Sequence, residues 1–202
     1  MQIKTIPILF FLAISINCFS QRKLQTDIVD ITKVSFFNPG FSYEKRIGKF
    51  QSILGQALLS TSISIGYSSS LGNTSSISVD PALYFQYRYY YNYERRQEKG
   101  KSTEMNSSNY LSPTFRTIFS KNRISTSHYS EDYRRPINTV GVVWGMQRNY
   151  NNRFSLDFNV GLGCLFTTAT FSDNTGRIIK GNVSKLSSLG QLNLGFWFNK
   201  RN

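Results

Sequence analysis

The chain has 202 residues, enough for one domain with its own core. It carries 24 Lys and Arg against 11 Asp and Glu, a formal net charge of +13. Such a balance is typical of nucleic-acid binding, but the sequence has no helix-turn-helix, zinc-finger or RNP motif and begins like an exported protein, so we expect no nucleic-acid partner. The basic residues gather in turns, as at Lys45-Arg46 and Arg134-Arg135. They are either solvated turn ends or groups attracted to anionic lipid headgroups and lipopolysaccharide phosphates.

Residues 1–20 have the features of a secretory signal peptide. Lys4 precedes the apolar run Ile6–Ile16, and Cys18-Phe19-Ser20 places small residues three and one before a cut ahead of Gln21. An uncleaved membrane anchor is the alternative, but the run is shorter than the roughly 20 residues of a spanning helix. We therefore expect export and a mature domain of residues 21–202, in which Cys164 is the single cysteine and no intramolecular disulfide is possible.

The apolar positions change phase between Ile31 and Arg46. They are even up to Phe36 and odd from Phe37 onward. A slip of one residue turns a strand inside out, and Asn38-Pro39-Gly40 suits a turn. The sequence predicts either one bulged strand or two short strands here.

Strict alternation predicts two more strands in the N-terminal half, each with its apolar residues at odd positions. They are Ala57–Tyr67 and Ile77–Tyr91, with Ile47–Ser52 as a short connection before the first and Ser68–Ser76 as a loop between them. The polar segment Asn92–Asn109 is predicted to open with one or two helical turns that end near Gly100.

The strand Arg153–Phe166 is the clearest in the chain, because all of its even positions are apolar and its odd positions are small or polar until Leu165. The same alternation predicts three further strands in the C-terminal half. They are Tyr110–Ser120, Val140–Met146 and Leu189–Phe198, with Arg148–Asn152 as a tight turn, Lys121–Ile137 and Phe171–Lys185 as long loops, and Asp173–Gly176 as a hairpin tip.

These six strands, with one or two more in Ile31–Arg46, predict an all-β fold: a transmembrane antiparallel up-and-down β-barrel, most naturally of eight strands. Polar residues or glycines interrupt every later apolar run, so a closed barrel is the form in which the mature chain could satisfy its backbone in lipid. An eight-stranded barrel has an interior filled by side chains rather than an open pore.

Two sets of candidate site residues follow from the alternation. Charged residues at inward positions predict a lumenal polar network that bridges the strands, because buried charges are costly unless paired; they are Glu44, Asp80, Arg88, Arg116 and Asp157. We interpret this network as structural, with a proton or ion path as the alternative. Outward aromatic residues predict an interfacial belt, or else an aromatic sheet face of a soluble protein; they are Tyr87, Tyr89, Tyr91, Trp144, Phe196 and Phe198.

Several segments together resemble small, uncharacterised outer-membrane β-barrel proteins of Bacteroidetes-type bacteria. They are an export signal that ends in Ser-Gln, an early NPGFSYEKRIGK, a central YYYNYERRQEKGK…NSSNYLS and a closing aromatic strand. The resemblance covers most of the mature chain and implies a cell outer-membrane location and a fold, but no activity. The last strand is also similar to the C-terminal signal read by the barrel-assembly machinery, although four residues follow Phe198.

The single histidine offers one catalytic hypothesis. His128 and Ser130 resemble the His-x-Ser element of outer-membrane lipid A deacylases, which would make His128 the base and Ser130 the nucleophile. In those enzymes Asn-Ala follows the serine, whereas Glu131-Asp132 follows it here. We expect no catalysis, no metal and no cofactor. The expected role is structural or a loop-mediated interaction, with outer-membrane lipid and lipopolysaccharide as the nearest partners, and a secreted lipocalin-like barrel that binds an apolar ligand is the alternative.

Overall fold

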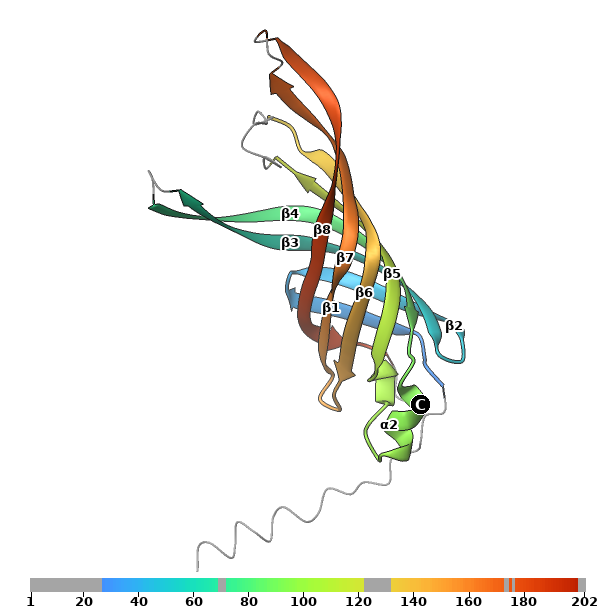
Figure 1. Ribbon diagram of the computed structural model, residues 1–202. Helices are drawn as coiled ribbons and strands as arrows, with labels where there is room; N and C mark the ends of the chain where they lie inside the picture. The colour runs from blue at the N-terminus through green and yellow to red at the C-terminus, as the bar shows by residue number, and fades with distance from the viewer. Residues whose placement is uncertain (1–26, 69–71, 122–131, 173–174, 176, 200–202) are drawn as a thin grey trace, which may run out of the picture.

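A computed structural model describes residues 27–68, 72–121, 132–172, 175 and 177–199. The fold is all-β: eight antiparallel strands close into a ring in chain order, so that β8 pairs with β1 (Figure 1). The predicted total of eight strands is confirmed. Their bounds are β1 Ile31–Phe37, β2 Gly40–Gly48, β3 Gln51–Ser68, β4 Gly72–Tyr89, β5 Asn109–Ser120, β6 Arg135–Asn149, β7 Phe154–Ser172 and β8 Ile178–Trp197.

The phase change in Ile31–Arg46 reflects two strands and a bulge. β1 and β2 form a hairpin whose turn contains Asn38 at a φ of 56°, in the left-handed region that asparagine tolerates. The pairing of β1 with β8 also shifts between Ser35 and Phe37. This bulge explains why the consecutive side chains of Phe36 and Phe37 are both exposed.

Two segments that were predicted to be loops consist largely of strand residues in the structure. Most of Ser68–Ser76 belongs to a hairpin in which β3 and β4 stay paired as far as Ser68 and Gly72. Likewise Phe171–Lys185 is largely strand, because β7 and β8 pair as far as Ser172 and Ile178. Neither segment shows a hydrophobic alternation in its sequence, yet backbone hydrogen bonds continue the ladder through both. Most of the predicted tip at 173–176, like the signal peptide at 1–20, lies outside the described residues.

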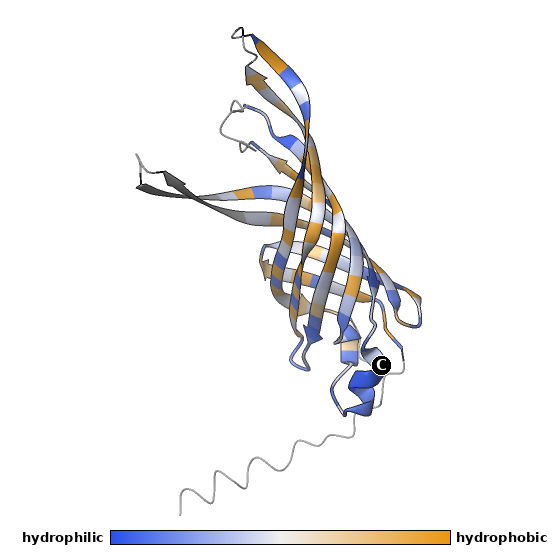
Figure 2. Ribbon diagram, viewed as in Figure 1, coloured by the Kyte–Doolittle hydropathy of each residue, from blue (hydrophilic) through white to orange (hydrophobic). Residues whose placement is uncertain are grey.

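The two faces of the ring differ in chemistry, and apolar and polar residues alternate along its strands (Figure 2). The outer face is lined by exposed apolar side chains, among them Phe41, Ile53, Leu59, Val79, Leu83, Phe85, Leu111, Phe115, Val140, Val142, Val160, Leu162 and Leu192. The inner face is lined by buried polar side chains, among them Ser42, Ser52, Gln56, Gln86, Ser112, Thr114, Thr139, Gln147, Ser155, Asn159, Gln191 and Asn193.

The strands β6 and β7 approach closely at glycines. An added Cβ at Gly161 would lie 2.0 Å from the carbonyl oxygen of Val142, which no side chain can tolerate. The glycines on the inner face of β7 therefore permit a close backbone approach, and their place inside a strand excludes a phosphate-binding loop.

The segment between β4 and β5 lies at one end of the ring (Figure 1). It holds α2, Tyr93–Glu98, and a single turn of 3₁₀ helix, η2, Glu104–Asn106. Gly100 follows α2 with a φ of 63°, so the predicted helical turns and their end are confirmed. Within the described ranges, neither helix is long and apolar enough to cross a membrane.

Candidate functional site

Four charged side chains meet inside the ring near α2. Lys33 of β1, Glu44 of β2, Arg88 of β4 and Asp157 of β7 are 6%, 0%, 1% and 5% exposed. Two positive and two negative charges make the group neutral, which is the condition for burying charges at tolerable cost. We call these four residues the charge cluster.

Arg88 is at the centre of the charge cluster. Its Nη1 donates to Asp157 Oδ2 at 2.8 Å and lies 3.8 Å from Glu44 Oε2. Its Nε and Nη2 both donate to Gln86 Oε1, at 2.9 and 2.7 Å, and Nη1 also donates to Gln147 Oε1 at 2.6 Å. The planar guanidinium thus joins β2, β4, β6 and β7, a task for which its fork of donors is suited.

Glu44 is held by neutral donors from three directions. Its Oε1 accepts hydrogen bonds from Ser52 Oγ at 2.7 Å, Tyr90 Oη at 2.6 Å and Asn106 Nδ2 at 3.0 Å. Its Oε2 accepts one from Gln147 Nε2 at 3.3 Å. The carboxylate is therefore solvated by the protein in place of water.

Tyr110 closes the cluster on the β5 side. Its Oη donates to Asp157 Oδ1 at 2.7 Å, and its ring centroid lies 4.1 Å from Arg88 Cζ, which is cation–π geometry. The ring fits because β6 has a glycine opposite it: a Cβ on Gly145 would lie 2.2 Å from Tyr110 Cζ.

The predicted network of five charged residues is divided in the structure. Glu44, Arg88 and Asp157 come together, but Asp80 and Arg116 lie elsewhere on the inner face. Asp80 accepts hydrogen bonds from Ser120 Oγ and Arg134 Nη1, both at 2.6 Å. It is eight residues from Arg88 on the same strand, about 26 Å at the usual rise per residue.

Arg116 is paired with no carboxylate among the described residues. Its Nη2 donates to Thr139 Oγ1 at 3.4 Å, and its Nε has no partner within the described part of the chain. The prediction that it joins a network of charges was therefore wrong.

Lys33 belongs to the charge cluster but was not predicted from the sequence. Its Nζ donates to Gln147 Oε1 at 2.6 Å and lies 3.7 Å from Asp157 Oδ2. Alternation along the strand could have indicated it, because an outward Val34 implies an inward Lys33. The change of phase a few residues later obscured this alternation. Gln147, Tyr90 and Asn106 carry no charge, so no argument from charge could have selected them.

A small cavity lies next to the charge cluster. A cavity of about 20 Å³, room for roughly one water molecule, lies beside the cluster, lined in part by Lys33, Ser42, Gln56, Asp157 and Asn193. No group of three or more His, Cys, Asp and Glu side chains in the described ranges could hold a metal ion.

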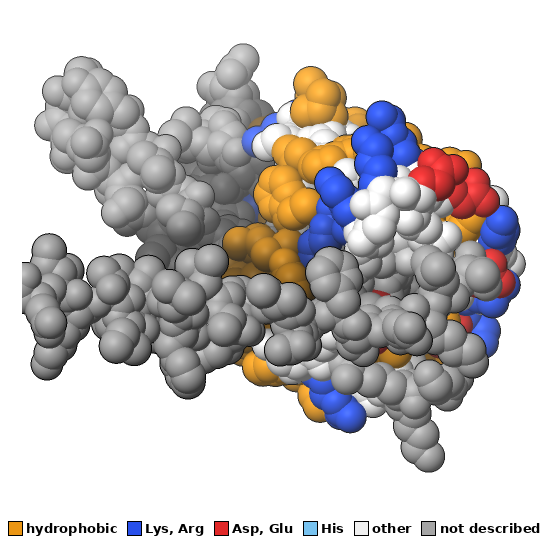
Figure 3. All heavy atoms as spheres, turned by 90° about the horizontal axis from the view of Figure 1, so that it is seen from below, with side chains coloured by type: hydrophobic (Ala, Val, Ile, Leu, Met, Phe, Trp, Pro, Cys, Tyr) orange, Lys and Arg blue, Asp and Glu red, His pale blue; other side chains and the backbone are white. Residues whose placement is uncertain are grey.

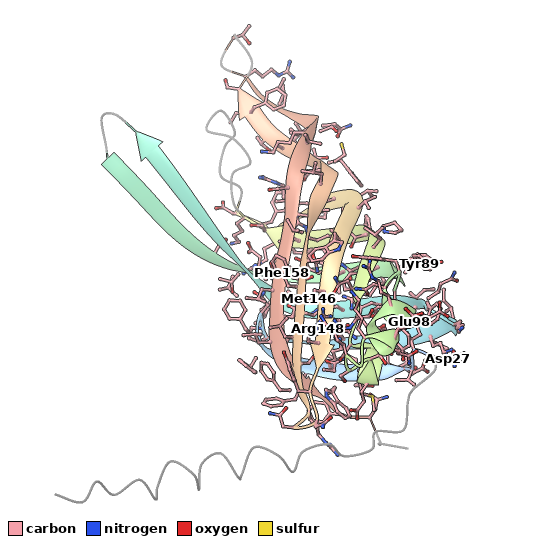
Figure 4. The ribbon with its side chains drawn as sticks, turned by 60° about the horizontal axis from the view of Figure 1, so that its bottom comes forward. Asp27, Tyr89, Glu98, Met146, Arg148 and Phe158 are labelled. Atoms are coloured by element: carbon pink, nitrogen blue, oxygen red, sulfur yellow. The ribbon has the colours of Figure 1, made fainter. Side chains whose placement is uncertain are left out.

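The segment from α2 to η2 covers the cluster at this end of the ring. Asn106 Oδ1 accepts a hydrogen bond from Val29 N, and its Nδ2 donates one to Val29 O, each at 2.8 Å. The side-chain carboxamide thus makes the same two hydrogen bonds to Val29 that a backbone peptide group of a neighbouring strand would make. Tyr93 donates to Asp27 O, and burial raises the pKa of its phenol. Asp27 and Glu98 lie at this end of the molecule (Figure 4).

All six predicted belt aromatics are at the surface, on β4, β6, β8 and the residues that follow β4 and β8. Trp144 Nε1 donates to Tyr91 Oη at 2.8 Å, although Tyr91 lies just beyond the end of β4. Lysine and arginine side chains lie beside hydrophobic ones when the molecule is seen from the α2 end (Figure 3). Hydrophobic and basic groups are therefore neighbours there.

No protein-family model, no curated protein and no solved structure matches the chain. The lipid A hypothesis rests on His128 and Ser130, which lie outside the described residues.

Proposed function

We propose that the chain is an exported outer-membrane β-barrel whose interior is closed by the charge cluster and whose role is structural or a loop-mediated interaction, without catalysis. The observation that carries the proposal is the inversion of the two faces: apolar side chains point outward, and charged side chains are buried inside. A soluble protein places these groups the other way round, whereas a barrel in lipid requires this arrangement.

The length of the apolar outer face supports a bilayer crossing. Along β7 the outward positions from Phe154 to Phe166 are apolar without exception, a run of 13 residues. At the rise of a strand tilted by about 45°, such a run covers about 30 Å, the thickness of a hydrocarbon core. Val160, at the middle of this run, is 48% exposed.

The proposal is favoured over a lipocalin-like barrel by the contents of the interior. A lipocalin keeps an apolar cavity for its ligand. Here the interior near α2 holds two buried positive and two buried negative charges, and the cavity beside them has room for roughly one water molecule.

The partners in this proposal are outer-membrane lipid and lipopolysaccharide, reached by the basic residues at the ends of the strands. The signal in residues 1–20 would direct export, and the strand β8, with Phe196 on its outer face and Phe198 directly after it, would be read by the barrel-assembly machinery.

Fractionation of the host membranes tests the proposal. We expect recovery in the outer membrane, resistance to carbonate extraction and a mobility shift between unheated and heated gel samples. Val160→Arg should lower the yield of heat-modifiable protein, because arginine at mid-membrane costs about 2–4 kcal/mol. Thr168→Arg, an outward position beyond the apolar run, is the matched control and should fold normally. Recovery as a soluble periplasmic protein, or equal behaviour of both variants, would contradict the proposal.

A further inference from the structure

The wall of the ring is much shorter at β1 and β2 than elsewhere. These strands have 7 and 9 residues, whereas their neighbours β8 and β3 have 20 and 18. The pairing of β8 with β1 stops at Leu194, and that of β3 with β2 stops at Leu58. Beyond these points, no described strand pairs with the facing edges of β3 and β8, and the two hairpins diverge (Figure 1). We call this opening the gap.

Asn38 is at the apex of the gap and bonds to both edges. Its Nδ2 donates to Leu192 O of β8 at 2.9 Å, and its Oδ1 accepts from Thr61 N of β3 at 3.1 Å. The side-chain carboxamide therefore stands in for a peptide group on each edge. Pro39 O also accepts from Leu59 N, at 2.8 Å.

These bonds show which backbone groups face the gap. In a strand the N–H and C=O of one residue point to the same side, and the side alternates with each residue. Since Leu192 faces the gap, the backbone groups of all even residues of β8 point toward it. Since Thr61 faces the gap, the backbone groups of all odd residues of β3 point toward it. Both edges present rows of donors and acceptors that a further strand could pair with.

The inner side of the apex is closed by a second contact. Gln191 Nε2 of β8 donates to Gln56 Oε1 of β3 at 3.0 Å, and both side chains are buried. The two edges are thus tied together beside the turn and free beyond it.

We propose that a second copy of this chain fills the gap, with β3 of each protomer paired to β8 of its partner. β3 runs antiparallel to β8, since each step from β8 through β1 and β2 to β3 reverses direction. A two-fold axis along the gap therefore places each β3 antiparallel to the partner's β8, which gives a self-complementary interface. In a membrane the same axis keeps both copies the same way up.

Charge selects this pairing over one of β8 with β8. β3 has no charged residue, whereas the free part of β8 carries Lys180 and Lys185 and no acidic residue. Pairing β8 with itself would bring these lysines together, and pairing it with β3 does not. Beyond the residues that bond to Asn38, β3 continues for 7 residues (62–68) and β8 for 14 (178–191), so the partner's β8 is long enough to pair with this whole part of β3.

The first test places one proline on each side of β8. Ser188 directs its N–H into the gap, so Ser188→Pro removes a donor needed by the dimer and none used by β7. Ser187 directs its N–H toward β7, so Ser187→Pro should abolish the heat-dependent mobility shift. We expect size exclusion with light scattering in mild detergent to give the protein mass of two chains for the native sequence and of one chain for Ser188→Pro, which should still show the shift.

The second test does not depend on folding of a proline variant. In a Cys164→Ser background, chains with Thr61→Cys and Ser188→Cys are co-expressed and treated in membranes with a short bis-maleimide. Both positions are exposed and outward. A cross-linked dimer should form in the mixture and only weakly with either variant alone. A monomer in both tests, or a dimer that survives Ser188→Pro, would overturn the proposal. Carbonate extraction of the same samples reports membrane insertion separately.

Discussion

Asp157→Asn tests the charge cluster most directly. The substitution keeps the size of the side chain and an oxygen for the Tyr110 hydroxyl, but it removes one of the two negative charges that face Lys33 and Arg88. A neutral group of four becomes a buried group with one excess positive charge. Removing one partner of a buried pair typically costs about 3–5 kcal/mol.

The lower end of this range is the better expectation, because Glu44 Oε2 lies 3.8 Å from Arg88 and still offsets part of its charge. A loss of about 3–4 kcal/mol should lower the urea midpoint by about 1.5–2 M for a slope near 2 kcal/mol per M. The assay is unfolding in lipid vesicles followed by tryptophan fluorescence, since Trp197 is buried and Trp144 is at the outer surface.

Lys33→Met provides the matched control. Combined with Asp157→Asn it restores neutrality, so the double variant should be more stable than Asp157→Asn alone although it carries more changes. A midpoint for Asp157→Asn within error of the native one, or a double variant less stable than the single one, would refute the reasoning that charge balance holds the cluster together.

Three further predictions concern the surroundings of the cluster. Gly145→Ala should destabilise the ring by about 1–3 kcal/mol by displacing the Tyr110 ring, whereas Gly190→Ala, with nothing within 4 Å of the new Cβ, should be nearly neutral in the same urea assay. Asn106→Gly keeps the left-handed backbone (φ 62°) but removes the carboxamide, so the Val29 amide should exchange hydrogen faster; an unchanged rate would contradict its anchoring role. Arg134→Ala should lower the free energy of unfolding by at most about 1 kcal/mol, and by less at high salt, because the Arg134 side chain is 44% exposed. A larger loss that salt does not reduce would contradict this prediction.

The sequence by itself determined the faces of the strands. Side chains alternate along an extended chain, so the apolar even residues of Phe154–Phe166 had to form one apolar face of the strand, and Asp157 had to lie on the opposite face. By the same alternation Glu44, Arg88 and Asp157 face inward, and six strands could be identified; the total of eight rested on the even strand number of bacterial barrels. It also located the turn at Asn38, where asparagine, proline and glycine favour a reversal.

The tertiary structure alone decided which inward residues share a level. Alternation gives the face of a residue but no height along the ring, which depends on the register between strands far apart in sequence. For this reason Asp80 and Arg116 were grouped with residues they do not meet. The polar ends of β7 and β8 were hidden likewise, because backbone hydrogen bonds, which are common to every sequence, define them. Two short strands in Ile31–Arg46 were one of two alternatives, and only the structure decided for β1 and β2.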